Sequence, residues 1–315
     1  MMKHFVFAAL AAAIVATSAQ AADRLRIGKS PAFAFAYVPL EVAKSKGMLE
    51  KDGIDVEIIA FEGASKMDLG LTSGSVDITI GGPTEMAAIA KGMPAKAVAI
   101  IARPVKELAI IVPYDSPIQS IKELKGKSIG IATVGSITQW AALELARSQG
   151  WKPEDVKLVS ISSAGGAAAA AMRTHQVDAD VSNLMSGVVM EKQKVARVIA
   201  VASDFASDFI MHEMSASDAL IQSNPDAIRR FIKAWFEAVA YMREHKAEAI
   251  AAAMPVTGLS QEDEEKEYDY LMPELTSSGV HDPAMIQRVA DSFVELKLIE
   301  KKPDMEKLYT NKFLP

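Results

Sequence analysis

The sequence contains no cysteine, which excludes disulfide bridges, thiolate metal sites and cysteine nucleophiles. It has only five histidines, and they are scattered without the close spacing of a metal site. The motifs G-x-G-x-x-G, G-x-S-x-G and H-E-x-x-H do not occur. These absences indicate a protein that needs no cofactor and no metal, and that lacks the common catalytic motifs.

The sequence also has no excess of basic over acidic residues. Lys and Arg total 34 against 40 Asp and Glu, so the formal net charge is −6. Nucleic-acid-binding proteins carry a basic surface, and we therefore expect no nucleic-acid partner. Half of the residues are hydrophobic, which is enough for a large core and disfavours a disordered chain.

Long hydrophobic runs are confined to the N-terminus, where residues 5–16 are almost all apolar and follow Lys3. Small residues come next and end in Ala19-Gln20-Ala21, the pattern of a signal-peptidase site. We expect residues 1–21 to be a cleaved signal peptide and the mature protein to be periplasmic. The alternative is an uncleaved N-terminal anchor, although the run is shorter than a membrane-spanning helix.

The chain repeats part of its pattern after about one hundred residues. Gly28 is matched by Gly130, 102 positions later, and Asp77 is matched by Asp178, 101 positions later. Around both pairs, short strands rich in Val and Ile alternate with helical stretches. This alternation predicts mostly parallel sheets covered by helices on both faces.

The repeat predicts an α/β protein with two lobes, each a mostly parallel sheet flanked by helices. We expect residues 22–112 and 208–315 to form the first lobe, and residues 113–207 to form the second. The chain then crosses twice between the lobes, and the two crossings form a hinge. The ligand cleft is expected between the lobes.

In sheets of this kind, ligands bind beyond the carboxyl ends of the strands and at helix N-termini. The loops selected by this rule are rich in glycine, which lets a ligand approach the backbone, and in hydroxyl groups that donate or accept hydrogen bonds. If the lobes face each other, these loops converge on one cleft. The candidate ligand-binding residues are Phe33, Tyr37, Gly63, Gly82, Pro83, Thr84, Gly135, Ser136, Thr138, Gly165 and Asn183.

Several of these residues have a second interpretation. Thr84 and Ser136 also stand where helix N-caps are expected, and a capping residue need not touch a ligand. Either Phe33 or Tyr37 is expected to wall the ligand, while the other aromatic residues of that loop pack in the core. The acidic run at residues 261–267 is expected to be a solvated helical surface.

Several short segments of the chain are unspecific when taken singly. Their order and spacing along the chain are together more specific. They are Tyr37-Val38-Pro39, Gly53-Ile54-Asp55-Val56-Glu57, Ser73-Gly74-Ser75-Val76-Asp77-Ile78, Ala90-Lys91-Gly92-Met93-Pro94 and residues 121–130. With these segments the chain resembles the nitrate/sulfonate/taurine-type solute-binding proteins of ABC importers. Those proteins share a fold with thiamine-pyrimidine-synthase-like proteins.

The resemblance implies a two-lobed periplasmic binding protein of type 2 that closes on a small-molecule ligand. It also implies delivery of the ligand to an ABC permease in the inner membrane, without enzymatic activity, and we expect a monomer. The selected loops contain no basic residue except Lys29 at their edge. We therefore expect a singly charged organic anion, a sulfonate or a carboxylate with an apolar or aromatic body. The residues that match the family's ligand contacts are Phe33, Gly82, Thr84, Ser136 and Asn183.

Two alternative functions remain at this point. An enzyme on the same fold, similar to the pyrimidine synthases, would need histidine or cysteine chemistry in the cleft. The lack of cysteine and the position of the histidines outside the selected loops argue against it. A sensing module that docks on a membrane receptor would share the ligand site and differ only in its docking surface.

Overall fold

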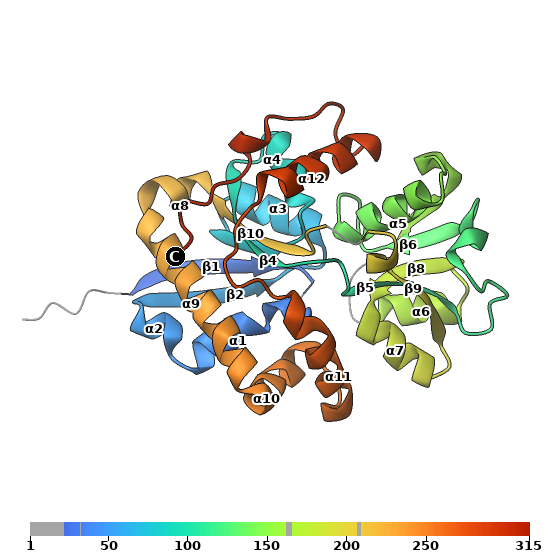
Figure 1. The fold of residues 1–315 in the computed structure, drawn as a ribbon, viewed down its shortest axis with the longest axis horizontal. Helices are drawn as coiled ribbons and strands as arrows, with labels where there is room; N and C mark the ends of the chain where they lie inside the picture. Colours follow the sequence, from blue (N-terminus) through green and yellow to red (C-terminus); the bar gives the residue numbers. More distant parts are fainter. Residues whose placement is uncertain (1–21, 32, 162–165, 207–208) are drawn as a thin grey trace, which may run out of the picture.

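The computed structural model describes residues 22–31, 33–161, 166–206 and 209–315. The predicted signal peptide lies outside this range. Two five-stranded sheets form the centres of two lobes (Figure 1). The first sheet has the strand order β2-β1-β3-β10-β4 and the second has the order β7-β6-β8-β5-β9. The strands are β1 Asp23–Lys29, β2 Ile54–Ala60, β3 Ile78–Gly81, β4 Ala95–Ala102, β5 Leu108–Pro113, β6 Ser128–Ile131, β7 Lys157–Ser160, β8 Ala179–Asn183, β9 Ala196–Val201 and β10 His212–Ser217.

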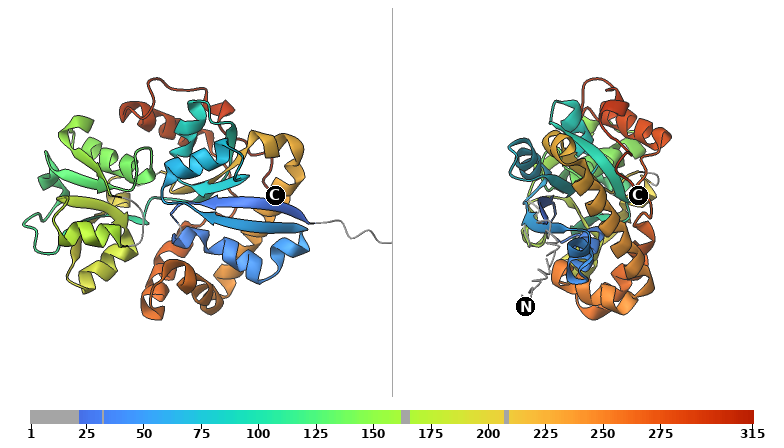
Figure 2. Two further views of the ribbon diagram at one scale, coloured as in Figure 1. Left: turned by 180° about the vertical axis from the view of Figure 1, so that it is seen from behind. Right: turned by 90° about the vertical axis from the view of Figure 1, so that its left-hand side faces the viewer.

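The prediction of two lobes built on mostly parallel sheets is confirmed. In each sheet, four strands run in one direction and a single strand, β10 or β5, runs against its two neighbours. Helices cover both faces of the sheets, as Figures 1 and 2 show. The helices are α1 Val38–Ser45, α2 Met48–Lys51, α3 Ala64–Thr72, α4 Glu85–Ala90, α5 Ile137–Ser148, α6 Ala167–Arg173, α7 Leu184–Lys192, α8 Asp218–Ser223, α9 Pro225–Glu244, α10 Lys246–Thr257, α11 Gln261–Leu271 and α12 Pro283–Glu295.

The sequence repeat corresponds to a repeated hydrogen-bond arrangement. In the first lobe, Asp77 accepts a hydrogen bond from the backbone N–H of Arg26 at 2.8 Å. In the second lobe, Asp178 accepts one from the backbone N–H of Ser128, also at 2.8 Å. Both carboxylates therefore bind the backbone of a neighbouring parallel strand, in the middle of β1 at Arg26 and at the start of β6 at Ser128, which explains why an Asp recurs at equivalent positions.

The crossing between the lobes begins earlier than the sequence predicted. Strand β5 pairs with β8 and β9 in the second sheet, whereas residues up to 112 had been assigned to the first lobe. The first crossing therefore lies between β4 and β5, at residues 103–107. Apart from Lys96, both strands are apolar, and the partners of β5 come later in the sequence, so the pattern alone does not separate them. The second crossing lies between β9 and β10.

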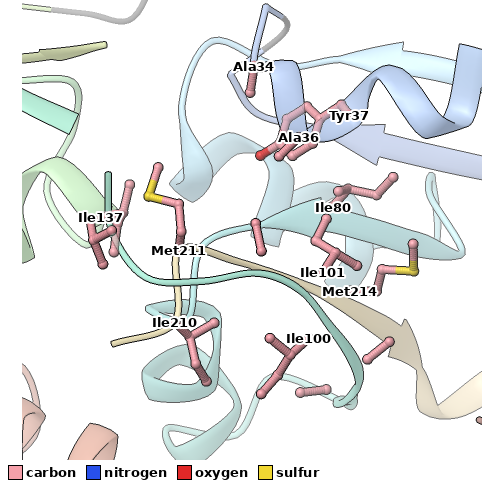
Figure 3. Close-up of a cluster of buried hydrophobic side chains, with 14 of the residues drawn as sticks. Ala34, Ala36, Tyr37, Ile80, Ile100, Ile101, Ile137, Ile210, Met211 and Met214 are labelled. Carbon is pink, nitrogen blue, oxygen red and sulfur yellow. The ribbon is translucent and has the colours of Figure 1, made fainter. Parts of the chain in front are cut away.

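Buried apolar side chains join the two lobes where the chain crosses. Figure 3 shows Ile137 of the second lobe facing Met211, which stands just before β10. Nearby, Trp140 of α5 stacks on Phe209 at a centroid distance of 3.9 Å. The indole of Trp140 also donates a hydrogen bond to Ser292 of α12 at 2.8 Å. In the described residues no helix combines the length and the apolar character needed to cross a membrane.

We predict that Asp77→Ala lowers the free energy of unfolding by about 2 kcal/mol, because it removes hydrogen bonds from the backbone and the guanidinium of Arg26 to a charged acceptor. Urea unfolding followed by circular dichroism measures the change. Asp55→Ala, at an exposed position of β2, is the control and should change stability by less than about 0.5 kcal/mol. Equal losses in both variants would contradict the assigned role of Asp77.

Candidate functional site

A cavity of about 710 Å³ lies between the two lobes. This volume is in the range of small-molecule binding sites. Its walls come from the loops after β1, β2 and β3 of the first lobe, and from the loops after β6 and β8 of the second. Both crossing segments contribute as well, and so does the connection between α10 and α11. The cavity is therefore placed where the sheet topology predicted the ligand.

The structure brings six of the predicted residues together on the cavity wall and places four elsewhere. The residues that line the cavity are Phe33, Gly63, Gly82, Ser136, Thr138 and Asn183. The predicted residues outside the lining are Tyr37, Pro83, Thr84 and Gly135. Gly165 lies outside the described residues.

Of the two aromatic candidates, Phe33 lines the cavity and Tyr37 does not. Tyr37 is fully buried, and its hydroxyl donates a hydrogen bond to the Ser30 carbonyl at 2.7 Å. The same hydroxyl lies 3.1 Å from Nδ1 of His212. Tyr37 therefore supports the loop that carries Phe33 and holds it against the second crossing.

The residues that line the cavity at helix starts are caps as well. Ser136 accepts a hydrogen bond from the Gln139 N–H at 3.3 Å at the start of α5. Asn183 accepts from the Met185 N–H at 2.9 Å at the start of α7. The start of α3, next to Gly63, has no side-chain cap. Capping and a place on the cavity wall are therefore compatible, as the two interpretations of Ser136 allowed.

Thr84 and Gly135 show that a position in a loop after a strand does not by itself place a residue on the cavity wall. Thr84 precedes α4, yet its side chain caps nothing, and its buried hydroxyl has no partner among the described residues. Gly135 is exposed, and its N–H donates to the side chain of Gln139. Gly135 lies next to Ser136, which lines the cavity, and Thr84 lies two positions after Gly82, which also lines it.

Two glycines allow the lobes to approach each other at the cavity. A Cβ atom at Gly82 would lie 3.0 Å from Cβ of Ile137 in the opposite lobe. A Cβ atom at Gly63 would lie only 2.7 Å from Cγ2 of Thr133. Across the same junction, Ser65 donates a hydrogen bond to the Val134 carbonyl at 2.8 Å. The lobes are thus in contact at this edge of the cavity.

Three titratable residues of the cavity wall were missed from the sequence. They are Glu107 of the first crossing, Asp180 of β8 and His212 at the start of β10. Glu107 and His212 bind each other, with 2.5 Å between Oε2 and Nε2. His212 had been placed outside the site because it is far from the selected loops in sequence. For Asp180, the sequence does contain a signal, because a charged residue within a largely apolar strand indicates a special position.

The acidic run supplies a fourth titratable residue and corrects the prediction of a solvated surface. Asp263, Glu264 and Glu267 of α11 are all buried, and Asp263 lines the cavity and pairs with Lys192 of the other lobe. Burial, with Glu107 and Glu264 nearby, raises the pKa of Glu267 to about 9. The remaining residues of the run, Gln261, Glu262, Glu265 and Lys266, are exposed as predicted, so α11 buries one face and leaves the other in solvent.

The charged side chains on the described cavity wall are mainly acidic. Among the described lining residues, the titratable side chains are Glu107, Asp180, His212 and Asp263, and there is no Lys or Arg. Burial raises the pKa of Asp180 to about 7. In the part of the chain that the structure describes, no three His, Asp or Glu side chains are grouped to hold a metal ion.

We predict that Asp180→Asn stabilises the ligand-free protein at pH 8 and has little effect below pH 4. The unfolded carboxyl ionises near pH 3.8 and the folded one only near pH 7, so the wild type loses stability as the pH rises between these values. The gain at pH 8 is at most about 4 kcal/mol. Thermal unfolding from pH 4 to pH 8 measures it.

The control for this prediction is Asp178→Asn, two residues earlier and outside the cavity. Burial opposes ionisation of Asp178 but is outweighed by hydrogen bonds from Ser128, so its pKa is lowered. This substitution should give no gain in stability at pH 8. An Asp180→Asn protein that is less stable than the wild type at pH 8 would contradict the assigned burial cost.

Comparison with known proteins places the chain among binding proteins and related enzymes. Residues 34–249 match the family described as NMT1/THI5 like. A putative aliphatic sulfonates-binding protein of Bacillus subtilis is 26% identical over 88% of this chain and 83% of its own length. A 4-amino-5-hydroxymethyl-2-methylpyrimidine phosphate synthase of Saccharomyces cerevisiae is 25% identical over 65% of this chain and 63% of its own.

A solved structure has the same fold. The alkanesulfonate-binding protein SsuA from Xanthomonas axonopodis pv. citri, bound to MOPS, superposes with a TM-score of 0.78 at 21% identity. The match covers 91% of this chain and 98% of that one. The two-lobed sheet architecture, the cavity between the lobes and the family match agree with one another, and the chain belongs to the NMT1/THI5-like family of the periplasmic binding protein fold.

Proposed function

We propose that the protein is the solute-binding component of an ABC importer, which captures a small organic ligand between its lobes and delivers it to a permease. The observation that carries this proposal is the cavity walled by loops of both lobes and by both crossing segments. A ligand in this cavity contacts both lobes only when they are closed. Binding therefore favours the closed form and presents it to the membrane partner.

An acidic group on the ligand is supported by the helix starts at the cavity. Helices α3, α5 and α7 all begin at its wall, and a helix N-terminus carries partial positive charge and backbone N–H donors. The start of α3 has no side-chain cap to compete for these donors. The proposed ligand accordingly carries a carboxylate or sulfonate, held by backbone groups because no Lys or Arg lies on the described wall.

Catalysis is the weaker alternative, although a histidine does line the cavity. Both ring nitrogens of His212 lie close to protein groups, Nε2 to Glu107 and Nδ1 to Tyr37 and the Gly81 carbonyl. Glu107 also accepts a hydrogen bond from the Phe35 N–H at 3.1 Å. These contacts fix the two crossing segments to each other, which is a structural role in a hinge. We therefore propose binding without turnover.

The test of the function is a thermal-shift screen of the mature protein with sulfonates, carboxylates, nitrate, aromatic acids and pyrimidines, followed by small-angle X-ray scattering. A ligand of an importer component should raise the melting temperature and reduce the radius of gyration, at a mass that corresponds to a monomer. A ligand that raises the melting temperature without any compaction would count against capture by hinge closure.

Periplasmic localisation is tested by the mass of the protein recovered from the periplasm of expressing cells. We predict that the chain begins at Ala22, because Ala19-Gln20-Ala21 precedes the expected cleavage. Ala21→Asp should block this cleavage and leave the uncut protein at the membrane. A wild-type protein recovered intact at full length would contradict the signal peptide.

Closure itself is tested at Gly82. We predict that Gly82→Val weakens ligand binding by about tenfold or more, because the added side chain meets Ile137 of the other lobe and keeps the cleft from closing. Titration calorimetry with the ligand found in the screen measures the loss, and scattering should show an expanded form.

The control for this variant is Ala251→Val, which adds bulk on an exposed position of α10 away from the cavity. It should bind like the wild type. If Gly82→Val also binds like the wild type, contact between Gly82 and Ile137 does not belong to the ligand-bound state.

A further inference from the structure

Asp180 differs from the other carboxylates of the cavity wall in having no positive partner. Asp263 pairs with Lys192, and Glu107 binds His212 and the Phe35 N–H. For Asp180, no ion pair is formed within the described residues. Asp180 is nevertheless only 2% exposed, so bulk solvent screens its charge little.

The surroundings of Asp180 are apolar. A Cβ atom on neighbouring Gly130 would lie 2.5 Å from Oδ1 of Asp180 and 2.9 Å from Cδ1 of Ile161, so the carboxyl and Ile161 share the space above Gly130. The part of the cavity wall contributed by α6 and α7 includes Ala168, Ala169, Val189, Met190 and the uncharged Ser186. An ionised carboxylate in such a place is costly unless a charged donor lies beside it.

We propose that Asp180 is a specificity residue that binds a protonated amino or amidino group of the ligand. This rests on the proposed function, and it adds a second recognition point to the helix starts that hold the acidic group. The ligand class is then a bifunctional molecule, with an acidic group at one end and a basic nitrogen at the other. Within the described protein, the backbone N–H of Val181 donates a hydrogen bond to the carboxyl of Asp180. An ammonium or amidinium N–H of the ligand supplies the positively charged donor that is missing.

The same geometry selects against purely anionic ligands. An anion next to Asp180 meets like charge in a buried place, and no cation of the described wall offsets the repulsion. An ammonium group at the same position converts the repulsion into attraction. Asp180 thereby discriminates between two ligands that share a body and an acidic end.

The test uses two such ligands, para-(aminomethyl)benzoate and para-toluate, which differ only in the ammonium group. Titration calorimetry should show that the wild type binds the amine-bearing compound at least about tenfold more tightly, as expected for one hydrogen bond between charged groups. The Asp180→Asn variant should lose this preference. Circular dichroism and thermal unfolding show that the variant is folded.

The matched control is Asp178→Asn, which removes a carboxylate two residues away, outside the cavity, and should keep the preference. Equal affinity of the wild type for both compounds overturns the inference, as does a preference that survives in Asp180→Asn or a failure of both compounds to bind. Each of these outcomes leaves the importer proposal standing if the thermal-shift screen and scattering find another ligand that closes the lobes.

Discussion

The contact between Glu107 and His212 joins the two segments on which the whole architecture depends. Glu107 ends the first crossing and His212 begins β10 after the second, with 2.5 Å between their side-chain atoms. Beyond the contact, each crossing continues into a strand at an interior position of a sheet, β5 between β8 and β9 and β10 between β3 and β4. The Glu107–His212 contact therefore fixes the two crossings to each other where they meet β5 and β10.

This arrangement makes the first lobe depend on the second. Strand β4 pairs with β10 in the first sheet, and β10 follows the entire second lobe in sequence. The second sheet consists of β5 to β9, which all lie between the two crossings. The first sheet is therefore complete only after the chain has crossed twice, and motion between the lobes is limited to the short crossings while the sheets remain intact. A cavity located at those crossings changes its shape whenever the lobes move.

Much of the fold was predictable from the sequence because its signals are local. The recurring Asp77 and Asp178, the alternation of strands and helices, and the loops after the strands gave two lobes and a cleft. The site was predictable where a residue lies at a strand end or a helix start, as for Gly82, Ser136 and Asn183. The assignment of β5 failed because its pairing partners are distant in sequence.

The residues that were missed share a different property, since their environment comes from tertiary packing. His212 reaches the cavity because β10 returns from the other lobe, and Asp263 reaches it because α11 turns its carboxylates inward. A histidine far from any expected loop and an acidic run typical of a solvated helix give no local sign of this. Asp180 is the exception, because a charge within an otherwise apolar strand already indicates a special position.

In the proposed mode of binding, the cavity recognises charge with two kinds of group that differ in strength and in range. Helix starts offer partial positive charge spread over several N–H donors, which suits an acidic group of varied shape. Asp180 offers a buried carboxyl whose ionised form is favoured beside a single cation and opposed beside an anion. Relatives of this chain bear names that refer to aliphatic sulfonates and to the synthesis of a pyrimidine phosphate, which are different small molecules. Discrimination among them then falls to the few side chains, such as Asp180, whose charge the fold leaves unpaired among the described residues.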